Sequence, residues 1–197
     1  MSSTASKLPP LATLGPFIAL ILACAFFATQ SERFLSAQNF ALILQQVMVV
    51  AVIAIGQTLV ILTAGIDLSC GMVMALGGIV MTKMAADYGL SAPVAIACGM
   101  AVTMLFGLVN GLLVTKIKLP PFIVTLGTLN IAFAATQLYS GAQTITDIPA
   151  GMTALGNTFQ LGQTAIVWGA VLMLVLYLVT WFCLLYTSDA ADDLLCV

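Results

Sequence analysis

The sequence contains no histidine and very few charged side chains. Charged residues make up 6% of the 197 positions, with five Lys and Arg against seven Asp and Glu. Without histidine, the chain cannot form a Ser-His-Asp triad, a histidine-ligated zinc site or an H-E-x-x-H motif. It also has no G-x-x-x-x-G-K-[ST] phosphate-binding loop, so any nucleotide chemistry must come from a partner protein. We therefore expect no catalytic residue, no metal site and no cofactor.

Cysteine pairs and basic clusters are missing as well. Five cysteines stand singly, mostly inside apolar runs, without the spacing of a disulfide framework or a metal site: Cys24, Cys70, Cys98, Cys183 and Cys196. We interpret them as small apolar residues that lipid tolerates. The few basic residues form no positive field, which excludes nucleic acid as a partner.

Long apolar runs fill the sequence instead. Hydrophobic residues make up 62% of the chain, and the mean hydropathy is +1.18, whereas soluble domains carry roughly a quarter of charged residues. One helical crossing of a bilayer needs about 20 mainly apolar residues, and the spacing of the polar interruptions predicts about six crossings. The runs do not alternate as the strands of a membrane barrel do. We therefore predict an all-α, polytopic transmembrane helical bundle in the lipid bilayer.

The polar interruptions give approximate bounds for the spans. We expect spans over residues 11–28, 40–62, 68–84, a fourth that ends near Thr115, and two more over 122–138 and 164–182. Ser36 to Asn39 offers a helix cap before the second span. Residues 1–10 are expected to form a disordered cytoplasmic N-terminus, and residues 139–163 a long external segment with room for a short surface helix.

The basic residues favour one orientation. With the N-terminus inside, Lys7, Lys116 and Lys118 lie in the cytoplasm, whereas Arg33 and Lys83 lie outside, each near an acid. Because cytoplasmic loops carry an excess of Lys and Arg, we expect a cytoplasmic N-terminus.

Asp67 is the only acid that stands between two long apolar runs, at a short polar break with Gly65. An ionised carboxylate in hydrocarbon costs at least a few kcal/mol, so Asp67 must lie at a membrane edge, in a protein-lined cavity or at a helix terminus. One interpretation is that Asp67 caps the third span by accepting a hydrogen bond from the backbone N–H of Ser69 or Cys70. The other makes the break a pathway or gating element, because irregular backbone at depth needs protein or water to pair it.

Uncharged polar side chains lie inside or beside the spans. An unpaired amide in hydrocarbon is costly, so these side chains must face a partner or water. They suit either hydrogen bonds between helices or a pathway for a neutral polyol. Our candidates for the translocation pathway or its gating are Gln57, Asp67, Ser69, Asn110, Thr125, Thr128 and Asn130.

Two small-xxx-small patterns indicate close helix crossings. One joins Gly71 to Ala75, and the other joins Gly107 to Gly111. We expect all four residues to serve helix packing.

The segment Gly56–Ser69, followed by Gly71, resembles the permease subunits of bacterial ABC importers for monosaccharides of the ribose/xylose type. Residues 45–47, 110–116 and 119–128 resemble further segments of that family in order and spacing. Cys70 stands where the family usually has a small aliphatic residue. The resemblance covers about residues 11–182, which are then a partial ABC permease transmembrane domain.

The resemblance implies a non-catalytic, multi-pass subunit of the bacterial inner membrane. It further implies a second permease subunit, expected to be an identical copy, two cytoplasmic ATP-binding subunits and a periplasmic sugar-binding protein. ATP hydrolysis by those subunits would drive alternating access of a pathway for a ribose- or xylose-like sugar.

Residues 183–197 change abruptly from apolar span to acidic tail, with Asp189, Asp192 and Asp193. They resemble translated adaptor sequence, and we expect a non-native tail; a short native cytoplasmic tail is the alternative. The resemblance implies that the family's ATPase-docking loop would begin where this tail begins. The chain as written is then expected not to couple to ATP.

Two other functions remain open from the residues. An ion- or proton-coupled secondary transporter needs a buried titratable residue, and only Asp67 stands between spans. A membrane scaffold that transports nothing needs neither amides nor broken backbone within its spans.

Overall fold

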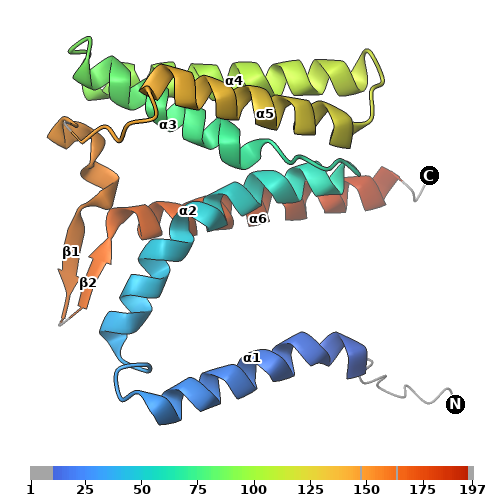
Figure 1. Cartoon of the computed structure of the whole chain (residues 1–197). Helices are drawn as coiled ribbons and strands as arrows, with labels where there is room; N and C mark the ends of the chain where they lie inside the picture. The colour runs from blue at the N-terminus through green and yellow to red at the C-terminus, as the bar shows by residue number, and fades with distance from the viewer. Residues whose placement is uncertain (1–10, 147, 163, 195–197) are drawn as a thin grey trace, which may run out of the picture.

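Six α-helices and one small β-hairpin make up the described part of the chain in the computed structural model (Figure 1). It describes the backbone of residues 11–146, 148–162 and 164–194, with side chains from 14 to 185 within those ranges. The expected disordered segment 1–10 lies outside the described residues. The helices are α1 (Leu11–Gln30), α2 (Ala37–Leu62), α3 (Cys70–Ala86), α4 (Ala92–Thr115), α5 (Pro121–Ser140) and α6 (Trp168–Leu194).

Most of these helices are suited to cross a bilayer. α2, α4, α5 and the Trp168–Leu185 part of α6 are each long and apolar enough to span it. Leu14–Gln30 of α1 and Cys70–Ala86 of α3 are shorter apolar helices. The predicted all-α polytopic bundle is therefore confirmed.

Local side-chain chemistry explains several helix ends. The Ser36 hydroxyl accepts a hydrogen bond from the backbone N–H of Asn39 at 3.2 Å, so the predicted cap of α2 is confirmed. α5 begins at Pro121, where the missing N–H costs nothing. α5 ends at Ser140 and is capped by Gly141, whose φ of 64° is a left-handed conformation that glycine adopts without strain.

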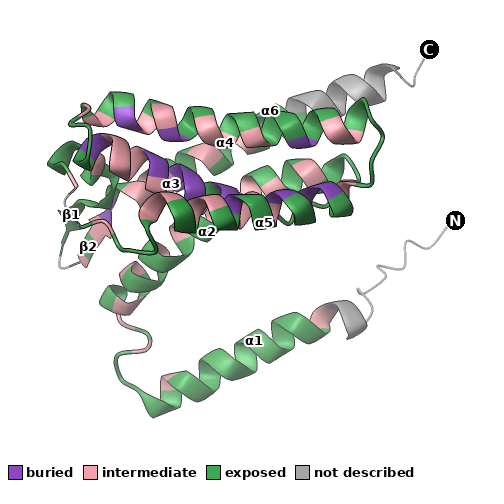
Figure 2. Ribbon diagram, turned by 45° about the horizontal axis from the view of Figure 1, so that its top comes forward, coloured by how far each residue is buried: buried purple, intermediate pink, exposed green. Residues whose placement is uncertain are grey.

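The helices form two packed groups. α3 packs against both α4 and α5, whereas α2 packs against α6 and the hairpin. Figure 1 shows α1 lying apart from the other helices, and nearly all of its described side chains are exposed (Figure 2). The main apolar core joins Val73, Leu76 and Val80 of α3 to Ala132 of α5.

α3 and α4 approach each other most closely at two glycines that we did not single out. A Cβ built on Gly99 would lie 2.6 Å from the carbonyl oxygen of Gly77, and one built on Gly77 would lie 2.5 Å from Cγ2 of Thr103. Gly99 follows the fully buried Ala95 by one helical turn, a small-xxx-small spacing that was available in the sequence. Only glycine fits this crossing.

The two small-xxx-small patterns that we expected to mark close crossings lie away from the contact between Gly77 and Gly99. Beyond the neighbouring backbone of its own helix, a Cβ built on Gly71, Gly107 or Gly111 would meet no atom of the described residues within 4 Å, and Ala75 is partly buried. The reason is geometric, because α4 meets α3 through the face that carries Ala95 and Gly99. The packing role of these four residues stays a prediction.

A hairpin that the sequence analysis missed lies between α5 and α6. After two short 3₁₀ turns, η1 (Ala150–Met152) and η2 (Ala154–Gly156), strand β1 (Thr158–Leu161) pairs antiparallel with β2 (Thr164–Val167). The sixth helix therefore begins at Trp168 and not at Thr164, because residues 164–167 are paired as a strand. α6 continues without a break to Leu194, so no change of backbone marks the expected boundary at residue 182, and the origin of the tail stays a prediction.

The connections separate into two ends of the molecule. Figure 1 shows the α2–α3 connection and the α4–α5 turn at one end, and the hairpin with the α1–α2 and α3–α4 turns at the other. Lys116 and Lys118 belong to the first end. Lys83 lies at the second end, 2.9 Å from Asp87 and 5.4 Å from the ring centre of Tyr139. This ion pair offsets the charge of Lys83.

We predict that Gly99→Ala destabilises the fold, whereas Gly127→Ala does not. Both changes add one Cβ within a helix, but Gly127 has open space around it. The free energy of unfolding of the Gly99 variant should lie about 1–3 kcal/mol below that of the Gly127 variant. Far-UV circular dichroism during an SDS titration of the purified protein measures the difference. Equal stability of both variants would contradict the crossing described here.

Candidate functional site

The backbone between α2 and α3 is irregular over residues 63–69. α2 ends at Leu62 and α3 begins at Cys70. Ala64 takes a φ of 57°, which L-residues with a side chain rarely adopt. Asp67 therefore lies in a chain discontinuity and not within a helix, as its isolated charge required.

The Asp67 carboxylate accepts two hydrogen bonds from Ser69. Its Oδ1 lies 2.7 Å from the Ser69 backbone nitrogen and 2.7 Å from the Ser69 hydroxyl. The predicted capping bond is thus present, and Ser69 is its donor. The position places the negative charge next to the first turn of α3, at the positive end of the helix dipole.

A chain of buried side chains continues from Ser69 to two other helices. The Asn110 amide of α4 donates to the Ser69 hydroxyl at 3.1 Å, and the Thr128 hydroxyl of α5 donates to the Asn110 Oδ1 at 2.5 Å. Ser69 is 1% exposed, Thr128 7% and Asn110 8%. Each donor points toward the carboxylate, so the hydrogen bonds polarise one another in one direction. We call Asp67, Ser69, Asn110 and Thr128 the polar relay.

Two further side chains pair the irregular backbone itself. The Thr125 hydroxyl lies 3.2 Å from the Ile66 carbonyl oxygen, and the Gln57 amide donates to the Asp67 carbonyl at 3.1 Å. Gln57 comes from α2 and Thr125 from α5. The Oε1 of Gln57 is buried without a partner among the described residues. The break thus receives its hydrogen bonds from helices on both sides.

The structure brings together six of the seven candidate residues and separates Asn130 from them. Asn130 is exposed, and its amide donates to the Leu126 carbonyl of its own helix at 2.8 Å. The face of α5 that carries Thr125, Thr128 and Ala132 is buried against the other helices. It is a helix contact, and Asn130 lies off it.

A cavity of about 390 Å³ adjoins the relay. Asp67 and Asn110 lie in its wall together with Thr63, Thr115 and Thr125, and Gly107 and Gly111 form part of its α4 side. The sequence analysis missed Thr63 and Thr115. Their positions one residue after α2 and at the end of α4 were the available signal, since both stand at the margins of apolar runs.

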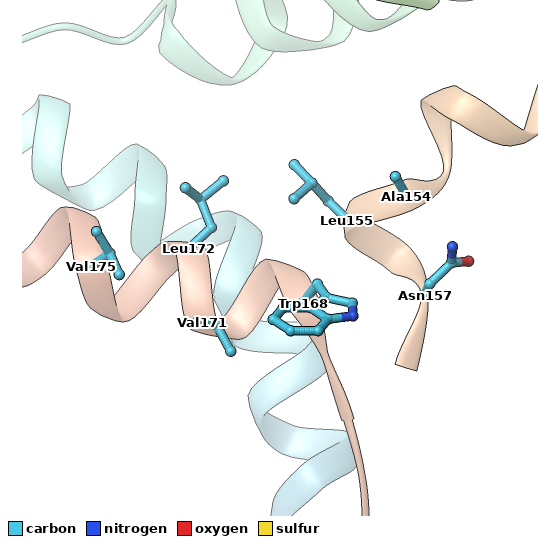
Figure 3. Close-up of a pocket in the computed structure, with 7 residues that line it drawn as sticks. All are labelled: Ala154, Leu155, Asn157, Trp168, Val171, Leu172 and Val175. Atoms are coloured by element: carbon cyan, nitrogen blue, oxygen red, sulfur yellow. The ribbon is translucent and has the colours of Figure 1, made fainter. Parts of the chain in front are cut away.

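A second cavity, of about 600 Å³, lies between η2 and α6 at the hairpin end (Figure 3). Its wall is apolar apart from Asn157 and the indole of Trp168. The Trp168 ring lies 4.6 Å from the ring of Phe159, centre to centre. This cavity does not adjoin the relay.

We predict that Asn110→Ala destabilises the protein and that Asn130→Ala does not. The first change removes the two buried hydrogen bonds that join Asn110 to Ser69 and Thr128, at a cost of about 1–2 kcal/mol. The second removes one exposed bond within a helix and should stay within about 0.5 kcal/mol of the parent. The same SDS titration measures both. A stable Asn110 variant would show that the relay contributes little to the fold.

Comparison with known proteins places this chain in a family. Residues 39–188 match the model of a family described as branched-chain amino acid transport system / permease component. The match extends six residues past Phe182. No solved structure matches the chain.

Curated relatives agree with that match. The chain is 42% identical over 179 residues to the fructose import permease protein of Rhizobium meliloti. The aligned residues cover 88% of this chain and 50% of the relative. It is 34% identical over 170 residues to the ribose import permease protein of Bacillus subtilis, covering 85% and 52%. It is 30% identical over 159 residues to the autoinducer 2 import system permease protein of Salmonella typhi, covering 81% and 46%.

The chain spans about half the length of these relatives. The expected resemblance to permease subunits of sugar importers is nevertheless confirmed over most of its residues. The chain belongs to the family of transport-system permease components that this model describes.

Proposed function

We propose that this chain is part of a permease subunit through which an ABC importer carries a monosaccharide across the bacterial inner membrane. The observation that carries the proposal is the polar relay, which places neutral hydroxyl and amide groups and one carboxylate at a backbone break between spans. Fructose and ribose appear in the names of curated relatives, and we propose such a sugar here. The subunit is non-catalytic in this proposal.

The energy for transport would come from partner proteins. The sequence has no phosphate-binding loop, so we infer two cytoplasmic ATP-binding subunits. A second copy of the permease would complete the pathway, and a periplasmic binding protein would deliver the sugar. The names of the relatives, which describe import permeases, support a transport system with such partners.

We infer that the end with the α2–α3 break faces the cytoplasm. Lys116 and Lys118 lie in the α4–α5 turn at this end (Figure 1), and cytoplasmic loops carry an excess of basic residues. The N-terminus, at the beginning of α1, would lie on the same side. The hairpin and the Lys83–Asp87 pair would face the periplasm.

The relay is suited to a gating role. It joins the start of α3 to the interior of α4 and α5 through three hydrogen bonds, so a shift of one helix along another must break at least one of them. Bonds of this kind define two discrete states, paired and separated. We propose that the break moves between such states as the pathway opens and closes.

A chimera tests the transport function. Residues 11–182 would replace the aligned part of the Rhizobium meliloti fructose permease, expressed with that system's ATPase and binding protein. We expect uptake of labelled fructose that persists in the presence of a proton uncoupler. Uptake should stop when the phosphate-binding-loop lysine of the ATPase is replaced. Uptake abolished by the uncoupler at normal ATP levels would support an ion-coupled transporter, and absent uptake from a stably inserted chimera would support a scaffold.

Asp67 variants of the same chimera separate geometry from charge. Asp67→Asn keeps an oxygen that accepts the two Ser69 bonds, whereas Asp67→Ala loses both at a cost of about 1 kcal/mol. We expect the Asn variant to retain most of the uptake and the Ala variant to lose it. Equal loss in both variants would contradict a capping role and would favour a role for the charge itself.

A further inference from the structure

The three threonine hydroxyl groups in the wall of the 390 Å³ cavity donate their hydrogens to backbone carbonyl oxygens. Thr63 donates to the Val60 carbonyl at 2.8 Å, and Thr115 donates to the Gly111 carbonyl at 2.7 Å. Thr125 donates to carbonyl oxygens of Ile66 and Pro121. A hydroxyl has one hydrogen and two lone pairs. All three threonines therefore present only acceptor lone pairs to the cavity.

The carboxylate of Asp67 adds a further acceptor to the same wall. Its Oδ1 takes both Ser69 bonds, while Oδ2 accepts none from the described residues. An ionised carboxylate has no hydrogen to donate. The wall thus combines four oxygen acceptors: Thr63 and Asp67 from the break between α2 and α3, Thr115 from α4 and Thr125 from α5.

Such a wall is matched by a solute that carries several O–H donors. We propose that this cavity is a binding subsite for a neutral polyol, held through its hydroxyl hydrogens, at the end of the molecule that carries Lys116 and Lys118. Its volume of about 390 Å³ falls within the range of roughly 300–1,000 Å³ that small-molecule sites occupy. The proposal rests on the proposed sugar transport, for which it gives a discharge site on the cytoplasmic side.

The shape of the cavity argues against a bare cation. A bound cation needs several oxygens converging within about 2.0–2.6 Å of one point, whereas this cavity holds on the order of a dozen waters by volume. The larger cavity in Figure 3 offers a contrast, because its apolar wall presents no comparable set of acceptors. Polyol binding is therefore assigned to the smaller cavity alone.

Protection of an engineered thiol tests the subsite in the full chain. Val114 lines the cavity without taking part in hydrogen bonds between side chains, so Val114→Cys adds a reporter and keeps all four acceptors. Ile117→Cys is the matched control, since Ile117 is exposed in the turn outside the cavity. Both variants are made with the native cysteines replaced by alanine, placed in lipid nanodiscs and alkylated with a water-soluble maleimide.

We expect fructose or ribose to slow alkylation of the Val114 variant with saturation. At ten times the half-maximal sugar concentration the rate should fall about tenfold, since occupancy follows mass action. Tetrahydropyran, which has the ring of a pyranose but no O–H donor, should not protect. The Ile117 variant should react at one rate in all conditions.

Two threonine variants identify the acceptor chemistry. Added to the Val114 reporter, Thr63→Val removes one acceptor from the cavity, whereas Thr58→Val removes a similar helix-bound hydroxyl outside it. We expect Thr63→Val to raise the half-maximal sugar concentration about three- to tenfold and Thr58→Val to leave it unchanged.

Three results would overturn the subsite. The first is that sugar does not slow alkylation, and the second is that tetrahydropyran slows it as much as sugar does. The third is that the protection depends on sodium and disappears when choline replaces sodium in the buffer. If one of these results were found while the chimera still took up fructose, the transport function would be retained and the subsite rejected. Protection without ATP-dependent uptake would retain the subsite and reject the importer.

Discussion

The need to pair an irregular stretch of backbone beside a charge shapes the centre of this molecule. Residues 63–69 lie between two helices, and the surroundings are apolar. Unpaired polar groups are costly in such surroundings. Gln57 from α2 and Thr125 from α5 bond backbone carbonyls of the break. Asn110 from α4 bonds the Ser69 side chain, and Thr128 from α5 bonds Asn110. Helices far apart in sequence are thus fixed around a single point.

This arrangement explains how the two packed groups of helices are connected. α3 belongs to one group with α4 and α5, and α2 belongs to the other with α6 and the hairpin. Few direct contacts join α2 to α3, so the hydrogen bond from Gln57 to the Asp67 carbonyl is a rare link between the groups.

The sequence predicted the break, the cap and most of the relay because their chemistry is local or obligatory. An ionised carboxylate at Asp67 is too costly within lipid, and the backbone N–H of Ser69, two residues on, can donate a hydrogen bond to it. Asn130 lies apart from the relay because its amide bonds to its own helix, an option that spacing alone does not exclude, and its pathway role stays a prediction. Gly77 and Gly99 were missed because periodicity does not tell which faces meet. The hairpin was missed because Ala165, Ile166 and Val167 are as apolar as the helix that follows them.

In the polar relay every hydrogen bond is donated in the direction of the Asp67 carboxylate, and this order determines which substitutions each position tolerates. Asn110 accepts from one neighbour and donates to the next, a combination that among side chains of its length belongs to the amide alone. Aspartate there would meet the Ser69 oxygen with an acceptor, and leucine would offer neither function. Thr128 only donates, so serine can serve in its place. Variation among related sequences should therefore be narrowest at the middle of the relay and wider at its outer hydroxyl.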